Sequence, residues 1–350
     1  MENNMKLNFV RRVDDAEMLI DGRSCYIAIN YLGISFLEKG TFKVLKTIHD
    51  FFGGVNGAVI DDGRYLVLRN MKTFYRVYDI EKMEYVSELD SSTFGCISPF
   101  GMTESLDGKS MYLIHGDFAS QEGMNIFVKG LNDNDDAEDK EVTYLYRYAS
   151  PELKDGELIQ MEKSYLDITR CKFLDGYFLI DLDQKVSFWN KDGKIIEHPE
   201  IASTDCSPII DEANQVFYIV SEFGVREYDK ELKEINKIDF ISDEKKEIAS
   251  ALYSLMRHDF NGMNSSEKTK MVNTERILDV RLLDSSHLCT LICETMSSYF
   301  KICVYNVKDG KCSANVRLGF QVNELGILDS THICFTTHKG VHILEVSNEN

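Results

Sequence analysis

The chain alternates short apolar runs with polar turns, and this pattern recurs at intervals along the sequence. Apolar runs such as Cys25–Ile29, Tyr65–Leu68 and Val216–Val220 each follow a polar turn. Runs of this length, rich in β-branched and aromatic residues, are typical of buried β-strands. Most of these turns contain Asp-Gly or Asp-Ser, which favour tight hairpins. The pattern therefore predicts antiparallel strands joined by short connections.

The apolar runs are the centres of a repeated unit. Each run is preceded by a shorter apolar strand, and it is followed by an alternating strand and then a more charged one. A four-stranded unit that recurs about every 40 to 50 residues is typical of a β-propeller blade. We therefore predict an all-β fold, a seven-bladed β-propeller of four-stranded antiparallel blades, in one domain over residues 1–350. The seven runs are Cys25–Ile29, Tyr65–Leu68, Met111–Ile114, Tyr177–Ile180, Val216–Val220, Leu288–Ile292 and Ile333–Thr336.

The last copy of the unit is incomplete. After Gly340–Val346 only Ser347–Asn350 remain, so the seventh blade lacks a fourth strand. Near the amino terminus, Lys6–Val13 alternates in polarity and belongs to no other blade. We expect this segment to complete the seventh blade, because pairing it there would cover an exposed sheet edge.

Two segments resemble the WD-repeat family of β-propellers. Leu45–Leu89 contains the turn Asp61-Asp62-Gly63 and then Val77-Tyr78-Asp79, and it is similar to one whole repeat. Val304–Cys312 is similar to the end of another repeat. The chain has no Gly-His dipeptide, and Tyr usually stands where the family has Trp. The resemblance implies a propeller with a degenerate consensus, and it implies no particular partner.

The chain departs from the repeat in a few longer segments. We expect insertions at 149–167, between the third and fourth blades, and at 239–276, between the fifth and sixth. Both would lie on the face that carries the links between blades and the turns between second and third strands. Insertions of this length are uncommon unless they are functional or disordered, so we expect this to be the working face.

Two departures from the repeat, the second of them expected on the opposite face, have a composition of their own. Within 239–276, Ser242 and the apolar residues from Ile248 to Met256 predict one amphipathic helix, which either covers the propeller or docks a partner. The acidic run Asn132–Glu141 is expected between the third and fourth strands of the third blade. It lacks the glycine of a calcium-binding loop, so we interpret it as a solvated loop.

Composition narrows the classes of partner. The formal net charge of −19 disfavours direct nucleic-acid binding and favours a protein partner with a basic patch. No apolar run reaches the roughly 20 residues of a membrane helix, and no secretory signal is visible. The nine cysteines are scattered through apolar runs, as expected of small buried residues in a reducing compartment. We therefore expect a cytoplasmic location and no membrane association.

The sequence contains no motif that assigns a reaction. Phosphate loops, nucleophile elbows and zinc patterns are missing, so we assign no catalytic residue, cofactor or metal ligand. Asp181 and Asp183 could form an acid–base pair, but solvated acids in a turn are the preferred interpretation.

The function we favour from the sequence is a non-catalytic protein-interaction platform. The alternatives are a propeller enzyme of the metal-dependent lactonase type, or a propeller that binds a small molecule or glycan. Either alternative predicts a cluster of carboxylates at the mouth of the axial channel. For the platform, the expected anchors are apolar or aromatic residues on short loops of the working face: Tyr31, Met71, Phe118, Phe223 and Tyr299.

Overall fold

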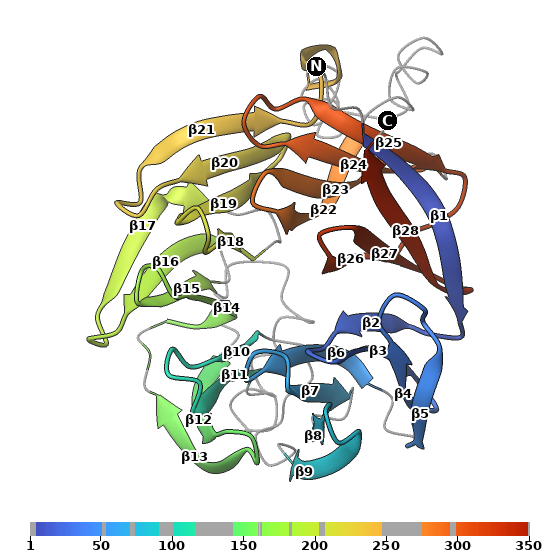
Figure 1. The fold of residues 1–350 in the computed structure, drawn as a ribbon. Coiled ribbons are helices and arrows are strands. Elements are labelled where there is room, and N and C mark those ends of the chain that lie inside the picture. Colours follow the sequence, from blue (N-terminus) through green and yellow to red (C-terminus); the bar gives the residue numbers. More distant parts are fainter. Residues whose placement is uncertain are drawn as a thin grey trace, which may run out of the picture. The chain divides into compact units, whose positions relative to one another are not determined.

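The computed structural model contains seven four-stranded antiparallel sheets, formed by 28 strands (Figure 1). This confirms the predicted fold class, the seven-bladed β-propeller of four-stranded blades. The chain divides into two compact units. The continuous unit is Ala16–Ser207, and the split unit is Met1–Asp15 with Pro208–Asn350. The structure describes residues 5–50, 54–70, 74–90, 101–116, 143–159, 161, 163–181, 184–202, 207–246, 275–294 and 299–348.

The continuous unit holds four sheets, each built from consecutive strands. In chain order the sheets are β2 (Met18–Asp21), β3 (Cys25–Asn30), β4 (Gly33–Glu38) and β5 (Val44–His49); β6 (Gly54–Ile60), β7 (Tyr65–Asn70), β8 (Phe74–Asp79) and β9 (Glu84–Asp90); β10 (Met102–Glu104), β11 (Ser110–Gly116), β12 (Thr143–Ala149) and β13 (Lys154–Ile159); and β14 (Tyr165–Cys171), β15 (Gly176–Asp181), β16 (Lys185–Asn190) and β17 (Ile195–Ala202).

The split unit holds the other three sheets, and one of them combines strands from distant parts of the chain. They are β18 (Ile209–Asp211), β19 (Val216–Ser221), β20 (Gly224–Tyr228) and β21 (Glu234–Asp239); β22 (Glu275–Asp284), β23 (His287–Glu294), β24 (Phe300–Asn306) and β25 (Cys312–Leu318); and β26 (Glu324–Asp329), β27 (His332–Thr337) and β28 (Gly340–Asn348) joined by β1 (Met5–Asp14).

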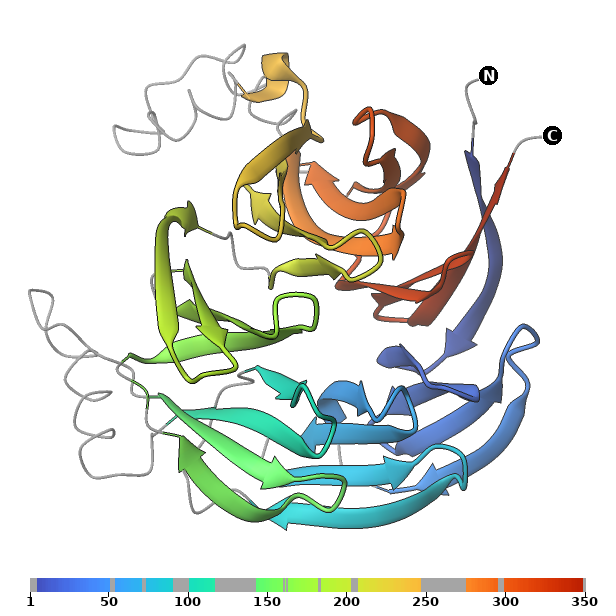
Figure 2. The ribbon, with the colours of Figure 1, turned by 60° about the vertical axis from the view of Figure 1, so that its left-hand side comes forward.

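The pairing of β1 with β28 completes the last sheet. The antiparallel register runs from Met5 opposite Asn348 to Asp14 opposite Gly340, and Figure 2 shows the two strands side by side. Gly340 has φ of +122°, and a Cβ there would lie 2.3 Å from the carbonyl oxygen of Val13. Only glycine allows this close approach without strain. The prediction that the amino-terminal strand closes the seventh blade is confirmed.

Local hydrogen bonds explain why an aromatic residue followed by Asp or Asn recurs at the ends of third strands. The carboxylate of Asp79 accepts the N–H of Lys82 at 2.9 Å. Asn190 accepts the N–H of Lys194 at 2.9 Å, and Asp229 accepts that of Lys233 at 3.0 Å. A short polar side chain thus closes the turn into the fourth strand, as Asp and Asn commonly do.

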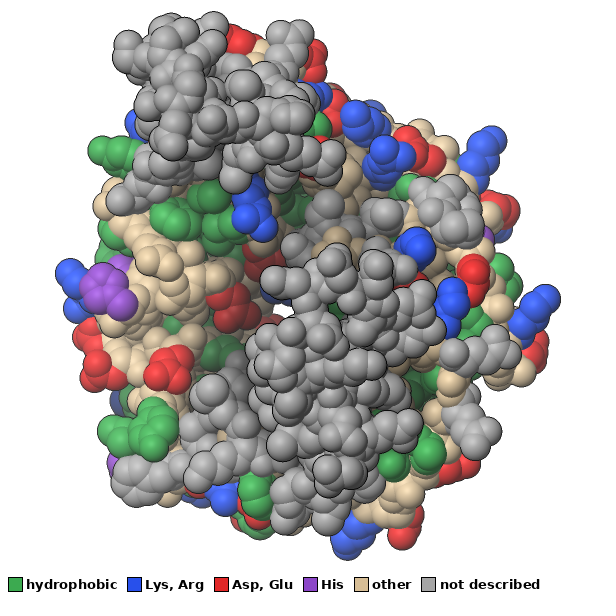
Figure 3. Space-filling view, turned by 180° about the vertical axis from the view of Figure 1, so that it is seen from behind, with side chains coloured by type: hydrophobic (Ala, Val, Ile, Leu, Met, Phe, Trp, Pro, Cys, Tyr) green, Lys and Arg blue, Asp and Glu red, His purple; other side chains and the backbone are tan. Residues whose placement is uncertain are grey.

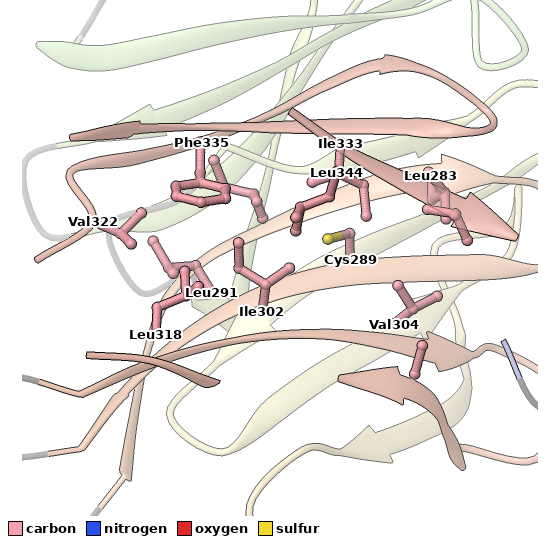
Figure 4. Close-up of a cluster of buried hydrophobic side chains, with 13 residues drawn as sticks. Leu283, Cys289, Leu291, Ile302, Val304, Leu318, Val322, Ile333, Phe335 and Leu344 are labelled. Atoms are coloured by element: carbon pink, nitrogen blue, oxygen red, sulfur yellow. The ribbon is translucent and has the colours of Figure 1, made fainter. Parts of the chain in front are cut away.

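Apolar side chains fill the space between neighbouring sheets. In the split unit the sixth and seventh sheets share one cluster, in which Cys289 and Ile302 face Phe335 and Leu344 (Figure 4). Cys289 is fully buried and free, as expected of a cysteine that serves as a small apolar residue. Burial of this kind stabilises the packing of these two sheets against each other.

The third sheet differs from the prediction in its strand order. β12 pairs directly with β11, so residues 117–142 connect a second strand to a third one. The expectation that the acidic run 132–141 joins the third and fourth strands is therefore wrong, although the run itself lies outside the described residues. The expected insertion 149–167 contains β13 and the first part of β14, because outward-facing polar residues in a fourth strand resemble a loop in sequence.

The insertion between β21 and β22 begins with a helical turn at residues 243–246. The carbonyl of Ser242 accepts hydrogen bonds from the N–H groups of Lys245 and Lys246, both at 3.0 Å. A helix start is therefore present where Ser242 predicts one. The apolar stripe from Ile248 to Met256 lies outside the described residues.

Candidate interaction surface

Three of the five expected anchors lie among the described residues, each in a turn between a second and a third strand. Tyr31 is in the β3–β4 turn and is 63% exposed. Phe223 is in the β19–β20 turn and is half-buried, and Tyr299 precedes β24 and is 45% exposed. Met71 and Phe118 lie outside the described residues. The turn positions agree with the prediction, and the proposed role in binding stays a prediction.

Phe223 contributes more to local structure than to an exposed surface. Its carbonyl oxygen accepts the N–H of Phe240 at 2.9 Å and that of Ile241 at 3.3 Å. These bonds fix the chain where it leaves β21 and enters the insertion.

Tyr299 is held in place by its own turn and by a neighbouring strand. Its carbonyl oxygen accepts the N–H of Glu294 at 3.0 Å, which closes the β23–β24 connection. The guanidinium of Arg317 on β25 lies over the ring, 4.2 Å from its centroid, and also pairs with Glu294 at 2.8 Å. A cation over an aromatic face is attractive. The ring is therefore positioned yet exposed.

Tyr299 belongs to a larger group of aromatic side chains in the split unit. The link after β25 passes next to it: a Cβ at Gly319 would lie 3.8 Å from the Tyr299 ring. Phe320 follows and stacks on His342 with ring centroids 5.7 Å apart, and Phe9 on β1 lies 5.8 Å from the same imidazole. We call Phe9, Tyr299, Phe320 and His342 the aromatic strip.

His342 is the centre of the strip. Its ring is parallel to that of Phe335, with an interplanar angle of 5° and centroids 4.9 Å apart. Its Nε2 lies 3.1 Å from the hydroxyl of Thr337. Burial, with a smaller contribution from Arg12, lowers the pKa of His342. The strip therefore presents a neutral imidazole at neutral pH and behaves as an apolar surface.

Much of the strip is open to solvent. Phe9 is 60% exposed and Phe320 is 38% exposed. Large exposed aromatic residues that lie together mark interaction sites more often than isolated ones do. Of the strip, the sequence analysis selected Tyr299 as a candidate anchor, and it selected none of the other three residues. The alternation of Lys6–Val13 indicates that Phe9 is on a strand, but no sequence signal brings it to His342.

The surface around the strip carries paired charges. Arg12 pairs with Asp14 at 2.5 Å, and Arg317 pairs with Glu294. Figure 3 shows acidic and basic side chains interspersed over the described part of one face. An exposed pair such as Arg12–Asp14 contributes little stability.

Both ends of the insertion are fixed to the split unit by charge. The buried carboxylate of Glu275 accepts hydrogen bonds from the ammonium groups of Lys245 and Lys301, the latter at 2.6 Å. Burial opposes ionisation of Glu275, but the two lysines outweigh it and lower its pKa. Lys246 bonds to Asp239 at 2.8 Å. The first turn of the insertion therefore has a defined position beside β22 and β24.

Two carboxylates near the first strands of the sixth and seventh sheets have an unusual environment. Burial raises the pKa of Asp279, on β22, and also that of Glu324, the first residue of β26. Arg281 bonds to Asp279 at 3.1 Å and opposes the shift in both groups. Carboxylates whose pKa is raised by burial beside a specific charged partner are a common feature of functional sites. This cluster is the described feature closest to the chemistry that an enzyme or ligand binder requires.

The described residues offer few other features of a ligand-binding site. Among the described residues, no group of three or more His, Cys, Asp or Glu side chains is placed to hold a metal ion. A cavity lined by Ile114, Leu145, Tyr165 and Leu179 has a volume of about 10 Å³, which is room for about one water molecule and not for a metabolite. In the same described part of the chain, no helix is long and apolar enough to cross a membrane.

The class of protein defined by these observations is a seven-bladed β-propeller with an exposed aromatic strip. Comparison of the chain with models of known families finds no match, and comparison with curated proteins finds no relative. The propeller class therefore rests on the sheets themselves, and the WD-repeat resemblance remains one of sequence pattern in two segments.

Proposed function

We propose that the protein is a non-catalytic interaction platform that binds a protein partner through the face carrying the inter-blade links and the turns between second and third strands. The aromatic strip carries this proposal. Its side chains are positioned by Arg317, Phe335 and Thr337, yet Phe9 and Tyr299 remain about half exposed. Rigid aromatic side chains bind a partner with little loss of conformational entropy.

The charge of the chain favours a partner with a basic patch. A net charge of −19 attracts a cationic surface over a distance of about one Debye length and speeds the encounter. The strip would supply the apolar contact, and the surrounding acidic residues would orient the partner. We expect this interaction in the cytoplasm, the compartment that fits the free cysteines of the described residues.

The experiment is affinity capture with a matched surface control. A triple variant, Phe9→Ser with Tyr299→Ser and Phe320→Ser, removes the exposed strip. The control is Ile235→Ser on the outer strand β21, because Ile235 is 51% exposed and lies in the same unit. We expect one stoichiometric partner with the wild type and the control, and its loss with the triple variant.

The captured partner must then be purified and its association rate measured. We expect the rate to fall as salt increases from about 50 to 200 mM, because salt screens the attraction. Capture that survives the triple variant would contradict the role of the strip. A rate that does not respond to salt would contradict the basic patch.

The cluster of Asp279, Arg281 and Glu324 favours a second candidate, a propeller that binds a polar small molecule or acts as an enzyme. A ligand that prefers the native state raises the melting temperature. We expect such a rise with a metal ion or metabolite only if this candidate is correct, and Asp279→Asn and Glu324→Gln should abolish it. A screen without any shift, alongside a captured partner, would leave the platform as the function.

A further inference from the structure

Two cysteine side chains meet on the sixth sheet. Cys303 on β24 is 4% exposed, whereas Cys312, the first residue of β25, is exposed. The register pairs Tyr305 with Cys312 and skips Ser313, so the two cysteines occupy diagonal positions on one face. Each thiol shifts the pKa of the other, and the Sγ of Cys312 also donates to the carbonyl oxygen of Ala314 at 3.3 Å. A buried thiol and an exposed thiol therefore touch at the edge of a sheet.

The surroundings of Cys312 favour its thiolate. The hydrogen bond from Cys303 is the main cause that lowers the pKa of Cys312, and it outweighs the burial of the sulfur. The side chain of Asn315 and the positive charge of Lys301 act in the same direction. The same hydrogen bond raises the pKa of Cys303, which keeps its proton. Cys312 is thus the thiol of the pair that a small oxidant can reach, and Cys303 is its buried neighbour.

Four other described cysteines lie in environments that disfavour the thiolate. Burial raises the pKa values of Cys25, Cys289, Cys293 and Cys334. A thiol that is accessible, readily ionised and next to a second thiol has the features of an oxidation-sensitive cysteine. Within the described part of the chain, Cys312 is the cysteine that combines them.

We propose that Cys312 and Cys303 form a thiol pair that reacts with hydrogen peroxide or a small alkyl hydroperoxide. The thiolate sulfur of Cys312 attacks one peroxide oxygen, so that an S–O bond forms, the O–O bond breaks and hydroxide leaves. The product is a sulfenic acid at Cys312. The sulfur of Cys303 then attacks it, an S–S bond forms, and the oxygen leaves as water with the proton of Cys303. The peroxide is reduced by two electrons, and the two thiols are oxidised to a disulfide.

The second step requires a small shift of β25. Diagonal neighbours lie roughly 7 to 8 Å apart between Cα atoms, whereas a disulfide spans about 4.4 to 6.8 Å. β25 is the outer strand of its sheet, and its pairing is irregular between Val304 and Tyr305, next to Cys312. An outer strand with a bulge can move without disturbing the sheet core. A small local movement of β25 would therefore allow the disulfide to form.

The oxidised pair would lie beside the start of the insertion. The hydroxyl of Tyr305 donates to the carbonyl oxygen of Phe240 at 3.1 Å, and the two rings are 4.5 Å apart. Tyr305 is opposite Cys312 in the register, so a shift of β25 would alter the contact between Tyr305 and Phe240. The inference does not depend on the proposed platform function.

The test treats the whole protein with a small excess of hydrogen peroxide and maps its cysteines by peptide mass spectrometry. We expect a Cys303–Cys312 disulfide in the wild type. Cys303→Ser should stop at a sulfenic acid on Cys312, which dimedone traps, and Cys312→Ser should leave Cys303 unmodified. Cys293→Ser is the matched control, because Cys293 is partly exposed on the same sheet, and it should behave like the wild type.

A second measurement reports on the thiolate without any oxidant. We expect iodoacetamide to label Cys312 faster than Cys293 in the same wild-type sample, and Cys303→Ser to slow that labelling about three- to tenfold at neutral pH, since each pKa unit changes the thiolate fraction tenfold. Equal labelling of Cys312 and Cys293 would overturn the inference even if a serine variant failed to fold. Oxidation of Cys312 that never yields the disulfide would overturn the role of Cys303.

Discussion

The two units each contain a group of interacting aromatic side chains, and the groups differ in what surrounds them. In the continuous unit, Tyr112, Tyr177 and Trp189 pack against one another with all three centroid distances between 5.1 and 5.3 Å. Tyr112 and Tyr177 are buried, and the hydroxyl of Tyr177 accepts the N–H of Leu106 at 2.7 Å. In the split unit, the strip around His342 leaves Phe9 and Tyr299 about half exposed.

The difference separates a group of aromatic residues that serves structure from one for which we propose a role in recognition. The buried group is satisfied within the protein, because its rings contact each other and a polar atom of Tyr177 is used. In the strip, the ring of His342 stacks on the buried ring of Phe335, whereas the side chain of Phe9 is 60% exposed. Because the first group is buried, we expect mutations there to lower stability. Because the strip is exposed, we expect mutations there to weaken binding of a partner.

The largest effect is expected from removing the strand that carries Phe9. Deleting residues 1–13 opens the edge of β28 along most of its length, so we expect the protein to lose more than about 4 kcal/mol of stability, in the exceptional range for a local change. Thermal unfolding measures this. Deleting residues 1–4 alone leaves β1 whole and serves as the control. Equal melting temperatures for the two truncations would show that β1 does not stabilise the sheet.

The buried group should give the next largest effect. Tyr177→Ala removes a ring that is 4% exposed, which typically costs about 3–5 kcal/mol. Tyr177→Phe keeps the ring but leaves the N–H of Leu106 without its acceptor, at a cost of about 1–3 kcal/mol. Urea unfolding measures both. If Tyr177→Phe left the free energy of unfolding unchanged, the hydrogen bond to Leu106 would contribute nothing to stability. Packing alone would then distinguish the buried aromatic group from the strip.

The exposed strip should tolerate substitution. Phe9→Ser changes a side chain that is 60% exposed, so we expect a change of at most about 0.5 kcal/mol in the same urea experiment. Partner capture should nevertheless weaken. A stability loss as large as that of Tyr177→Ala would place Phe9 in the core and remove the contrast between the groups.

The smallest expected effect is on how the free energy of unfolding depends on pH. Burial, aided by Arg12, lowers the pKa of His342 in the folded protein, so folding favours the neutral ring. The contribution is complete above the unfolded histidine pKa of about 6.5, and it is lost as pH falls through the lower folded value. His342→Gln should flatten this part of the dependence of unfolding free energy on pH between about 7.5 and 5. An unchanged slope would show that His342 is as solvated as an ordinary surface histidine.

The fold could be predicted because its determinants are local and repeated. Turn residues such as Asp61, Asp62 and Gly63 all adopt positive φ, which their residue types allow, and they recur between the apolar runs. The closing strand was predictable because one blade lacked a strand and one alternating segment lacked a blade. The third sheet was harder to assign, since its fourth strand has few apolar residues.

The site could be predicted only in part, because it depends on neighbours across strands. Alternation indicates which side chains point outward, but it does not show that Phe320 and Phe9 both reach His342. The thiol pair illustrates the same limit. Cys289 and Cys293 are closest in sequence, yet it is Cys303 and Cys312 that touch, because a hairpin and a skipped residue bring them together.

The register of β1 also sets an order for folding during synthesis. The continuous unit is complete once Ser207 has left the ribosome, and its sheets use only consecutive strands. β1 is made before all of it but cannot pair until β28 has been translated. Until then its hydrogen-bonding edge and Phe9 are open to pairing with other chains.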